Sequence, residues 1–127
     1  HVGFAWFGLA LLLSGASQLL GLRHGVPLLG LGALHALTMG FLGSVLMAMV
    51  TRVSSGHSGR PLTADNLVWG AFWALQVATV LRIASALEHA TSWLTLAAAA
   101  IWLTVMVLWG QRMIRWYGLP RADGQPG

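Results

Sequence analysis

Four long runs of apolar residues, separated by short polar segments, set the pattern of this chain. The runs cover residues 2–22, 28–53, 67–87 and 93–114. A helix rises about 1.5 Å per residue, so about 20 residues cross the roughly 30 Å of hydrocarbon in a bilayer. Each run meets that length, and the short connections favour antiparallel neighbours. The pattern therefore predicts an all-α, polytopic membrane protein with four antiparallel transmembrane helices in contact with a lipid bilayer.

Residues at the ends of the runs indicate where the helices begin and stop. Thr63, Asp65 and Asn66 are candidate N-caps of the third helix, because short polar side chains accept hydrogen bonds from the free amides of a first helical turn. Residues 118–127 are rich in glycine and proline, which predicts a flexible tail. The whole chain, residues 1–127, is interpreted as a single membrane domain.

Small residues recur at every fourth position of the second run. In lipid, helices gain little from hydrophobic burial against each other, so a stripe of small residues favours close packing of two backbones. The stripe consists of Gly32, Ala36, Gly40, Ser44 and Ala48.

Composition supports the membrane assignment and limits the chemistry. The chain is 57% hydrophobic and 8% charged, whereas soluble domains carry about 25% charged residues. It contains no cysteine, so any metal must be bound by histidine, methionine or oxygen ligands. The first run is too long for a signal peptide and has no basic leader. Because the chain begins at His1, we expect it to be the C-terminal piece of a longer protein.

The arginines indicate orientation rather than nucleic-acid binding, because they lie near helix ends and form no basic stripe. Under the positive-inside rule, the side with more arginines is cytoplasmic. The loop from Arg52 to Arg60 and the C-terminus are therefore predicted to be cytoplasmic. That side carries Arg52, Arg60, Arg112, Arg115 and Arg121, and the other side carries Arg23 and Arg82.

An ionisable side chain lies inside the second run. His35 falls about 10 Å from the end of its predicted helix. At a similar depth we expect Gln18 of the first helix and Gln76, Thr79 and Arg82 of the third, which predicts an intramembrane polar layer. Buried arginine costs about 2.5–3.5 kcal/mol on insertion scales, so ionisable groups at this depth are functional candidates. Alternatively, Arg82 extends to the interface and the histidine is a neutral side chain satisfied by neighbouring helices.

His35 is a candidate ligand for a metal or cofactor. Neutral imidazole is the expected donor, and Met39, one turn later on the same face, is a soft second donor. Two residues of one helix cannot take opposite axial positions of a haem, and the chain offers no other His or Met at this depth. A haem iron then takes its second ligand from a missing N-terminal part or is five-coordinate. Alternatively, the metal is copper bound by His35 and Met39.

The segment after the second run combines positive charge with small residues. Arg52, His57 and Arg60 surround serines and glycines whose backbone amides can turn inward as an anion-binding nest. Guanidinium groups and free amides suit a haem propionate or a small oxyanion. The alternative is that the arginines only follow the positive-inside rule and the small residues only make a turn.

The other histidines form two candidate metal clasps. His1 falls on the side of His57, and His24 falls on the side of His89, but neither pair has a diagnostic ligand spacing. The sequence has no serine-nucleophile motif and no glycine-rich phosphate loop, which argues against a hydrolase or an NTPase. Metal-based redox chemistry stays open.

Three segments together closely resemble the NnrS family: HALTMG from His35, MVTRVS from Met49, and GHSGRP from Gly56 to Pro61. The opening HVGFAW from His1 is similar to a further segment of that family. Its members are multi-pass bacterial membrane proteins, described as containing haem and copper and associated with the response to nitric oxide during denitrification. They are considerably longer than this chain. The resemblance implies that the chain is a C-terminal portion whose partners include the missing N-terminal helices.

The resemblance also implies site residues. The histidines marked in the family fall on His1, His35 and His57, and the arginines fall on Arg52 and Arg60. We therefore expect a protein of the bacterial inner membrane that binds haem, and copper as a second cofactor, and that handles nitric oxide or a small anion at the metal. The resemblance does not assign a particular histidine to either cofactor.

Two other functions stay open at this point. The chain is alternatively a transporter or anion-carrier module, in which the polar layer lines a path and the arginine-rich loop captures the anion. A purely structural packing module predicts instead that substitutions at His35 and His57 are tolerated.

Overall fold

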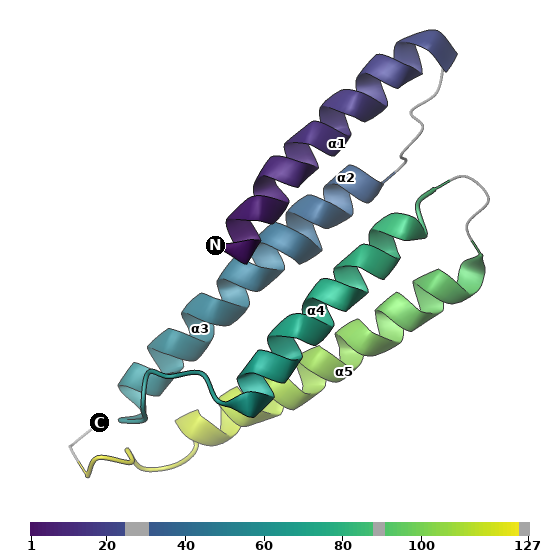
Figure 1. Ribbon diagram of the computed structural model, residues 1–127. Helices are drawn as coiled ribbons and strands as arrows, with labels where there is room; N and C mark the ends of the chain where they lie inside the picture. Colours follow the sequence, from purple (N-terminus) through teal and green to yellow (C-terminus); the bar gives the residue numbers. More distant parts are fainter. Residues whose placement is uncertain (25–30, 88–90, 125–127) are drawn as a thin grey trace.

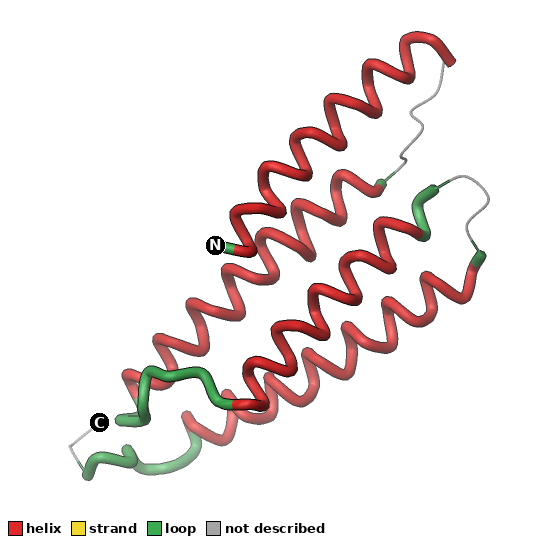
Figure 2. Tube along the Cα trace, in the orientation of Figure 1, coloured by secondary structure: helices red, strands yellow, loops and turns green. Residues whose placement is uncertain are grey.

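Within the described residues the protein folds into four long helical spans that run alternately up and down (Figures 1 and 2). The computed structural model describes residues 1–24, 31–87 and 91–124. Each span is long and apolar enough to cross a membrane, which confirms the predicted all-α membrane fold. The elements are α1 (Val2–His24), α2 (Gly32–His35), η1 (Ala36–Gly43), α3 (Ser44–His57), α4 (Asn66–Ala84) and α5 (Ser92–Tyr117).

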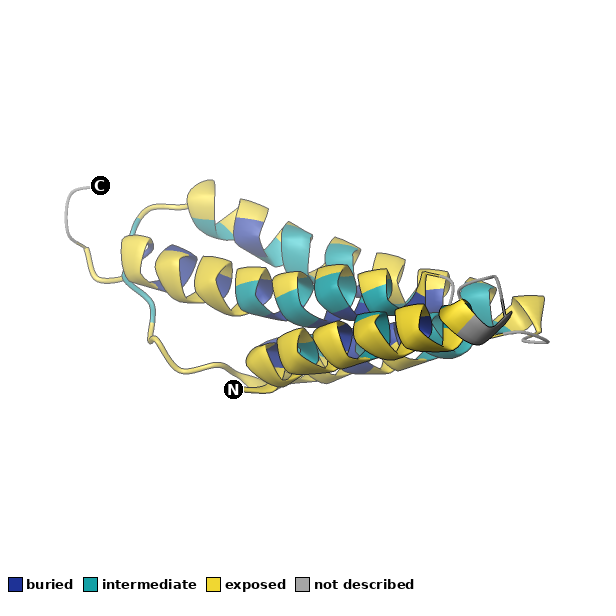
Figure 3. Cartoon of the chain, turned by 90° about the horizontal axis from the view of Figure 1, so that it is seen from above, coloured by how far each residue is buried: buried dark blue, intermediate teal, exposed yellow. Residues whose placement is uncertain are grey.

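The central element of the bundle is a continuous helix, Gly32–His57, made of α2, the π-helical η1 and α3. We call it the second span. It lies against α1 on one side and against α4 and α5 on the other (Figure 1). Met47, Leu75 and Val105 form the core where the second span, α4 and α5 meet. Buried positions face neighbouring helices and the outward faces are exposed (Figure 3), as contact with lipid requires.

Helix α1 is shifted along the second span, so that the N-terminus lies beside the middle of that span (Figure 1). The close approach of Gly3 fixes this position: a Cβ atom there would lie 3.1 Å from Cγ2 of Val45 and 3.4 Å from Cβ of Ser44. The shift places the start of α1 well away from the end of α3, which decides which polar side chains can meet.

The stripe of small residues receives a tryptophan of α1. A Cβ atom at Gly40 would lie 2.6 Å from both Cγ and Cδ2 of Trp6, so only glycine leaves room for this ring. Ala48, the last member of the predicted stripe, is exposed. The first four positions of the stripe are buried, but not against a single helix, because Gly32 faces Ile83 of α4 whereas Gly40 faces Trp6 of α1. The buried members are Gly32, Ala36, Gly40 and Ser44.

The position of Trp6 completes a polar node between three helices. Nε1 of Trp6 donates a hydrogen bond to Oε1 of Gln76 at 2.6 Å. Nε2 of Gln76 donates to Oγ of Ser44 at 3.0 Å and to the carbonyl of Phe72 at 3.0 Å. Gln76 is buried, and a buried amide that loses its partners costs free energy. Because its partners come from α1 and the second span, these hydrogen bonds hold both helices against α4.

The second span ends later than the sequence predicts, at His57 rather than at residue 53. Gly59 has a φ of 66°, and its amide donates to the carbonyl of Gly56 at 3.2 Å. The amide of Arg60 donates to the carbonyl of Ser55 at 2.9 Å. These two bonds make the glycine-dependent Schellman ending of a helix. The amides of Gly59 and Arg60 close the helix, which favours the simple turn over the anion-binding nest.

Asp65 caps the start of α4, as one of the three predicted candidates. Oδ1 of Asp65 accepts a hydrogen bond from the amide of Val68 at 3.1 Å. Arg112 of α5 donates to the same carboxylate, from Nη1 to Oδ1 at 3.0 Å and from Nη2 to Oδ2. One carboxylate thus joins the first turn of α4 to the last turns of α5.

The hydrogen bonds of Asp65 should make part of the free energy of unfolding sensitive to acid. The hydrogen bond from Arg112, followed by that from the Val68 amide, lowers the pKa of Asp65 from its ordinary value of 3.8. A carboxyl group with a depressed folded-state pKa stabilises the fold above its unfolded pKa, and this contribution is lost as pH falls through the folded pKa. Because the pair is solvent-exposed, we expect less than about 1 kcal/mol. Thermal unfolding of wild type and Asp65→Asn across this acid range measures it, and parallel pH profiles would contradict it.

Residues 118–124 lie against the end of the second span, although composition predicted a flexible tail. The amide of Ala122 donates to the carbonyl of Ser58 at 2.9 Å, and Nη1 of Arg121 donates to the carbonyl of His57 at 3.2 Å. Arg121 also pairs with Asp123 at 2.6 Å. The last carbonyls of a helix have no partner within it, and these contacts supply partners for two of them.

Candidate functional site

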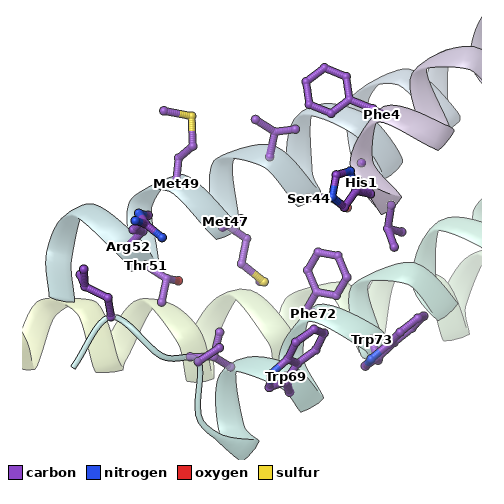
Figure 4. A pocket seen from close by; sticks show the side chains of 17 residues that line it. His1, Phe4, Ser44, Met47, Met49, Thr51, Arg52, Trp69, Phe72 and Trp73 are labelled. Carbon is purple, nitrogen blue, oxygen red and sulfur yellow. The ribbon is translucent and has the colours of Figure 1, made fainter. Parts of the chain in front are cut away.

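A pocket of about 600 Å³ opens between the start of α1, the middle of the second span and the first half of α4 (Figure 4). Its walls are mainly aromatic and aliphatic: Trp69, Phe72 and Trp73 come from α4, and Phe4 comes from α1. Met47 extends from the second span toward Phe72 (Figure 4). Ligand pockets typically occupy about 300–1,000 Å³ and have mostly apolar walls, and this pocket has both properties.

Two groups with distinct chemistry line this pocket. His1 offers an imidazole at the start of α1, and Arg52 offers a guanidinium on α3 (Figure 4). Both residues are exposed. Hydroxyl groups of Ser44 and Thr51 also line the pocket, and each is held by the bundle: Ser44 by Gln76, and Thr51 by a 2.8 Å bond from Nε1 of Trp109.

The residues of the pocket fit a haem-like group. Imidazole nitrogen is the most common axial donor to haem iron, and guanidinium groups pair well with carboxylates such as haem propionates. Flat aromatic side chains provide an apolar surface for a macrocycle. His1 and Arg52, two of the residues implied by the family resemblance, are thus brought to one pocket.

His35 lies elsewhere, at the junction of α2 and η1. Its ring is half-buried, and Nε2 is fully buried without a hydrogen-bond partner among the described residues. Buried polar nitrogens are nearly always paired, so this atom is exceptional. The π-helix that follows it is also uncommon, and π-helical turns are frequently found at functional sites.

Met39 and His35 are not brought together in the groove that Met39 lines. This groove of about 890 Å³ lies between the second span and α5, and Arg82 also lines it, whereas His35 is not part of that lining. The predicted pairing of His35 with Met39 is therefore not seen in this groove.

The predicted polar layer is dispersed in the structure. Gln18 is exposed, and its neighbour Ser17 is buried instead. Gln76 is bonded to Ser44, which lies about two helical turns beyond His35 along the second span.

The two other members of the predicted layer are satisfied within α4 and its C-cap. Thr79 is fully buried, and its hydroxyl donates to the carbonyl of Leu75 at 2.8 Å. Nη1 of Arg82 donates to Oγ of Ser85 at 2.8 Å. Arg82 still lies within electrostatic range of His35, whereas Gln18 and Gln76 are placed elsewhere, so only part of the predicted layer surrounds His35.

The predicted clasp between His1 and His57 is not formed. His1 lies beside the middle of the second span, near Val45, whereas His57 ends that span about 18 Å further along its axis. The pair His24 and His89 falls outside the side chains that the structure describes. Among the described residues, no group of three or more His, Asp or Glu side chains is placed to hold a metal ion.

Arg60 and His57 do not join Arg52 in the pocket. His57 is exposed at the last position of α3. The guanidinium of Arg60 lies over the ring of Trp116, 5.2 Å from its centroid, and Arg112 lies over the same ring at 4.9 Å. Sequence reasoning assigned neither Trp116 nor Arg112 to a site, since their contacts join segments far apart in the chain.

Comparison with known proteins gives one match. A family model described as NnrS protein matches residues 1–121, which is nearly the whole chain. No curated protein and no solved structure matches it.

Proposed function

This chain belongs to the NnrS family, and we propose that it binds haem in the pocket between His1 and Arg52. Membership of the family connects the protein in general with the response to nitric oxide. The observation that carries the haem assignment is that one mostly apolar pocket of about 600 Å³ joins an imidazole, a guanidinium and three aromatic side chains of α4. The NnrS segments quoted from the sequence include both His1 and Arg52, which supports the same choice.

The side chains of the pocket take separate roles in this proposal. His1 supplies a nitrogen donor for the iron, and Arg52 pairs with a propionate. Trp69, Phe72 and Trp73 would provide the apolar surface against which the ring packs. When bound, haem would supply an iron centre that can bind nitric oxide or exchange an electron.

The described residues do not fit a complete copper site. No cluster of three His, Asp or Glu side chains exists among them, and the groove lined by Met39 does not include His35. His35 offers one buried and unpaired nitrogen. A copper ion there would need its other ligands from outside the described chain, so we derive no chemistry through copper.

The proposal includes orientation in a bacterial inner membrane, with the ends of α3 and α5 facing the cytoplasm. The positive-inside rule supports it, because positive residues at this end outnumber those at the other. They are Arg52, Arg60, Arg112, Arg115 and Arg121.

Absorption spectroscopy of the purified membrane protein tests the haem proposal. We expect a Soret band, and we expect Arg52→Gln to weaken haem binding about tenfold, because a charge-assisted hydrogen bond contributes about 1.5–3 kcal/mol. Arg115→Gln is the matched control, since Arg115 is an exposed arginine of α5 that does not line the pocket. A protein that stays colourless after haem is supplied would overturn the proposal.

A further inference from the structure

A second, smaller cavity of about 190 Å³ lies where α3 ends, α4 begins and α5 ends. Thr51 and Val68 contribute to its wall and also to the wall of the larger pocket, so the two hollows are neighbours. The smaller cavity differs in character, because its lining includes two arginines, an aspartate and several hydroxyl groups. Its lining residues include Ser55, Arg60, Thr63, Asp65, Arg112 and Trp116.

The cavity carries an excess of one positive charge. Arg60 and Arg112 both lie over the ring of Trp116, with guanidinium carbons 5.2 and 4.9 Å from its centroid. Arg112 is neutralised by its two hydrogen bonds to Asp65. Arg60 has no acidic partner in the described parts of the chain, and its Nη1 makes only a long bond of 3.5 Å to the carbonyl of Ser58. Its remaining donors are available to a ligand.

A buried hydroxyl group also faces this cavity. Ser55 is 4% exposed and lines the cavity, and its side chain makes no hydrogen bond within the described residues. The hydroxyl of Ser55 is therefore free to donate a hydrogen bond to a ligand in the cavity. Arg60 and Ser55 therefore offer a charged and a neutral donor to the same small space.

We propose that this cavity binds a small, planar, monovalent oxyanion of the nitrate or short-carboxylate type. Its volume equals about six water molecules at about 30 Å³ each, which admits such an ion with a few waters and excludes a haem. One negative charge balances the excess positive charge of the site. The planar fork of Arg60 matches the geometry of a planar oxyanion, and Ser55 supplies a further hydrogen bond.

Calorimetric titration of the purified protein with sodium nitrate tests the site. We expect one saturable binding event, weakened about tenfold or more by Arg60→Gln and about threefold to tenfold by Ser55→Ala. Arg115→Gln, which alters an arginine of the same helical end outside the cavity, should bind nitrate like wild type. Absence of saturable nitrate binding, or equal affinity in wild type and Arg60→Gln, would overturn the proposal.

Asp65→Asn should increase anion binding. A merely structural role of the arginines would not produce that increase. Asparagine caps a helix about as well as aspartate, so α4 keeps its start. The substitution removes the only carboxylate in the lining and frees Arg112, so the excess charge of the site rises by one. We expect nitrate and sulfate each to bind about tenfold more tightly to this variant than to wild type. Weaker nitrate binding in Asp65→Asn would contradict the assigned site.

Discussion

Replacing His1 with alanine should remove the haem absorption band, whereas replacing His35 or His57 should leave it in place. His1 lines the pocket of about 600 Å³, and neither of the other two histidines does. Mutation of a residue that only orients a metal ligand lowers metal affinity about 10–100-fold. Loss of the ligand itself should therefore lower it more than about 100-fold. Haem content and the Soret absorbance of the purified variants measure this difference directly.

The His35 variant makes this experiment decisive. His35 has the buried, unpaired Nε2 and is a candidate ligand on sequence grounds, so it is the strongest competitor. Loss of the band in His35→Ala, with retention in His1→Ala, would transfer the ligand role to His35 and refute the pocket assignment. His57→Ala controls for the general effect of removing an exposed histidine, because His57 lies at the solvent-facing end of α3.

Gly40→Ala should destabilise the bundle by about 2–5 kcal/mol. The new Cβ atom would lie 2.6 Å from the ring of Trp6, and the ring would have to move. Overpacking costs about 1–3 kcal/mol, and displacement of Trp6 also breaks its 2.6 Å hydrogen bond to Gln76, a buried group whose unpaired state costs a similar amount. Unfolding in a detergent or denaturant titration, followed by helical circular dichroism, measures the change.

Two further variants separate this clash from the general effect of changing a helical glycine. Gly8→Ala in α1 meets no atom within 4 Å, so we expect it to be neutral or to stabilise by up to about 1 kcal/mol. In a Trp6→Leu background the cost of Gly40→Ala should shrink, because the obstructing ring is gone. Equal costs in the two backgrounds would show that Trp6 does not define the contact.

The sequence predicted the features that depend on neighbouring residues. Hydrophobic length determines whether a segment spans a membrane, and the four predicted runs correspond to the four observed spans. Asp65 was a recognisable cap because capping involves only the next few residues. The end of the second span was missed, although Gly59 is its local signal, because the apolar run had already stopped several residues earlier.

The candidate sites depended on the lateral and axial placement of helices, which no local pattern encodes. The predicted polar layer assumed that all helices begin at the same depth, but the contacts of Gly3 with Val45 and of Gly40 with Trp6 shift α1 along the second span. The same shift brings His1 into the pocket with Arg52 and separates it from His57.

By itself the sequence determined the membrane fold and the family, together with the residue types available for chemistry, because hydrophobic length, capping and motifs are properties of contiguous segments. Only the tertiary structure decided that Arg52 shares a pocket with His1, and that Arg60 shares a cavity with Arg112 and Ser55. The physical reason is steric: in lipid, helices settle where small residues admit large ones, and that fit sets which polar groups meet.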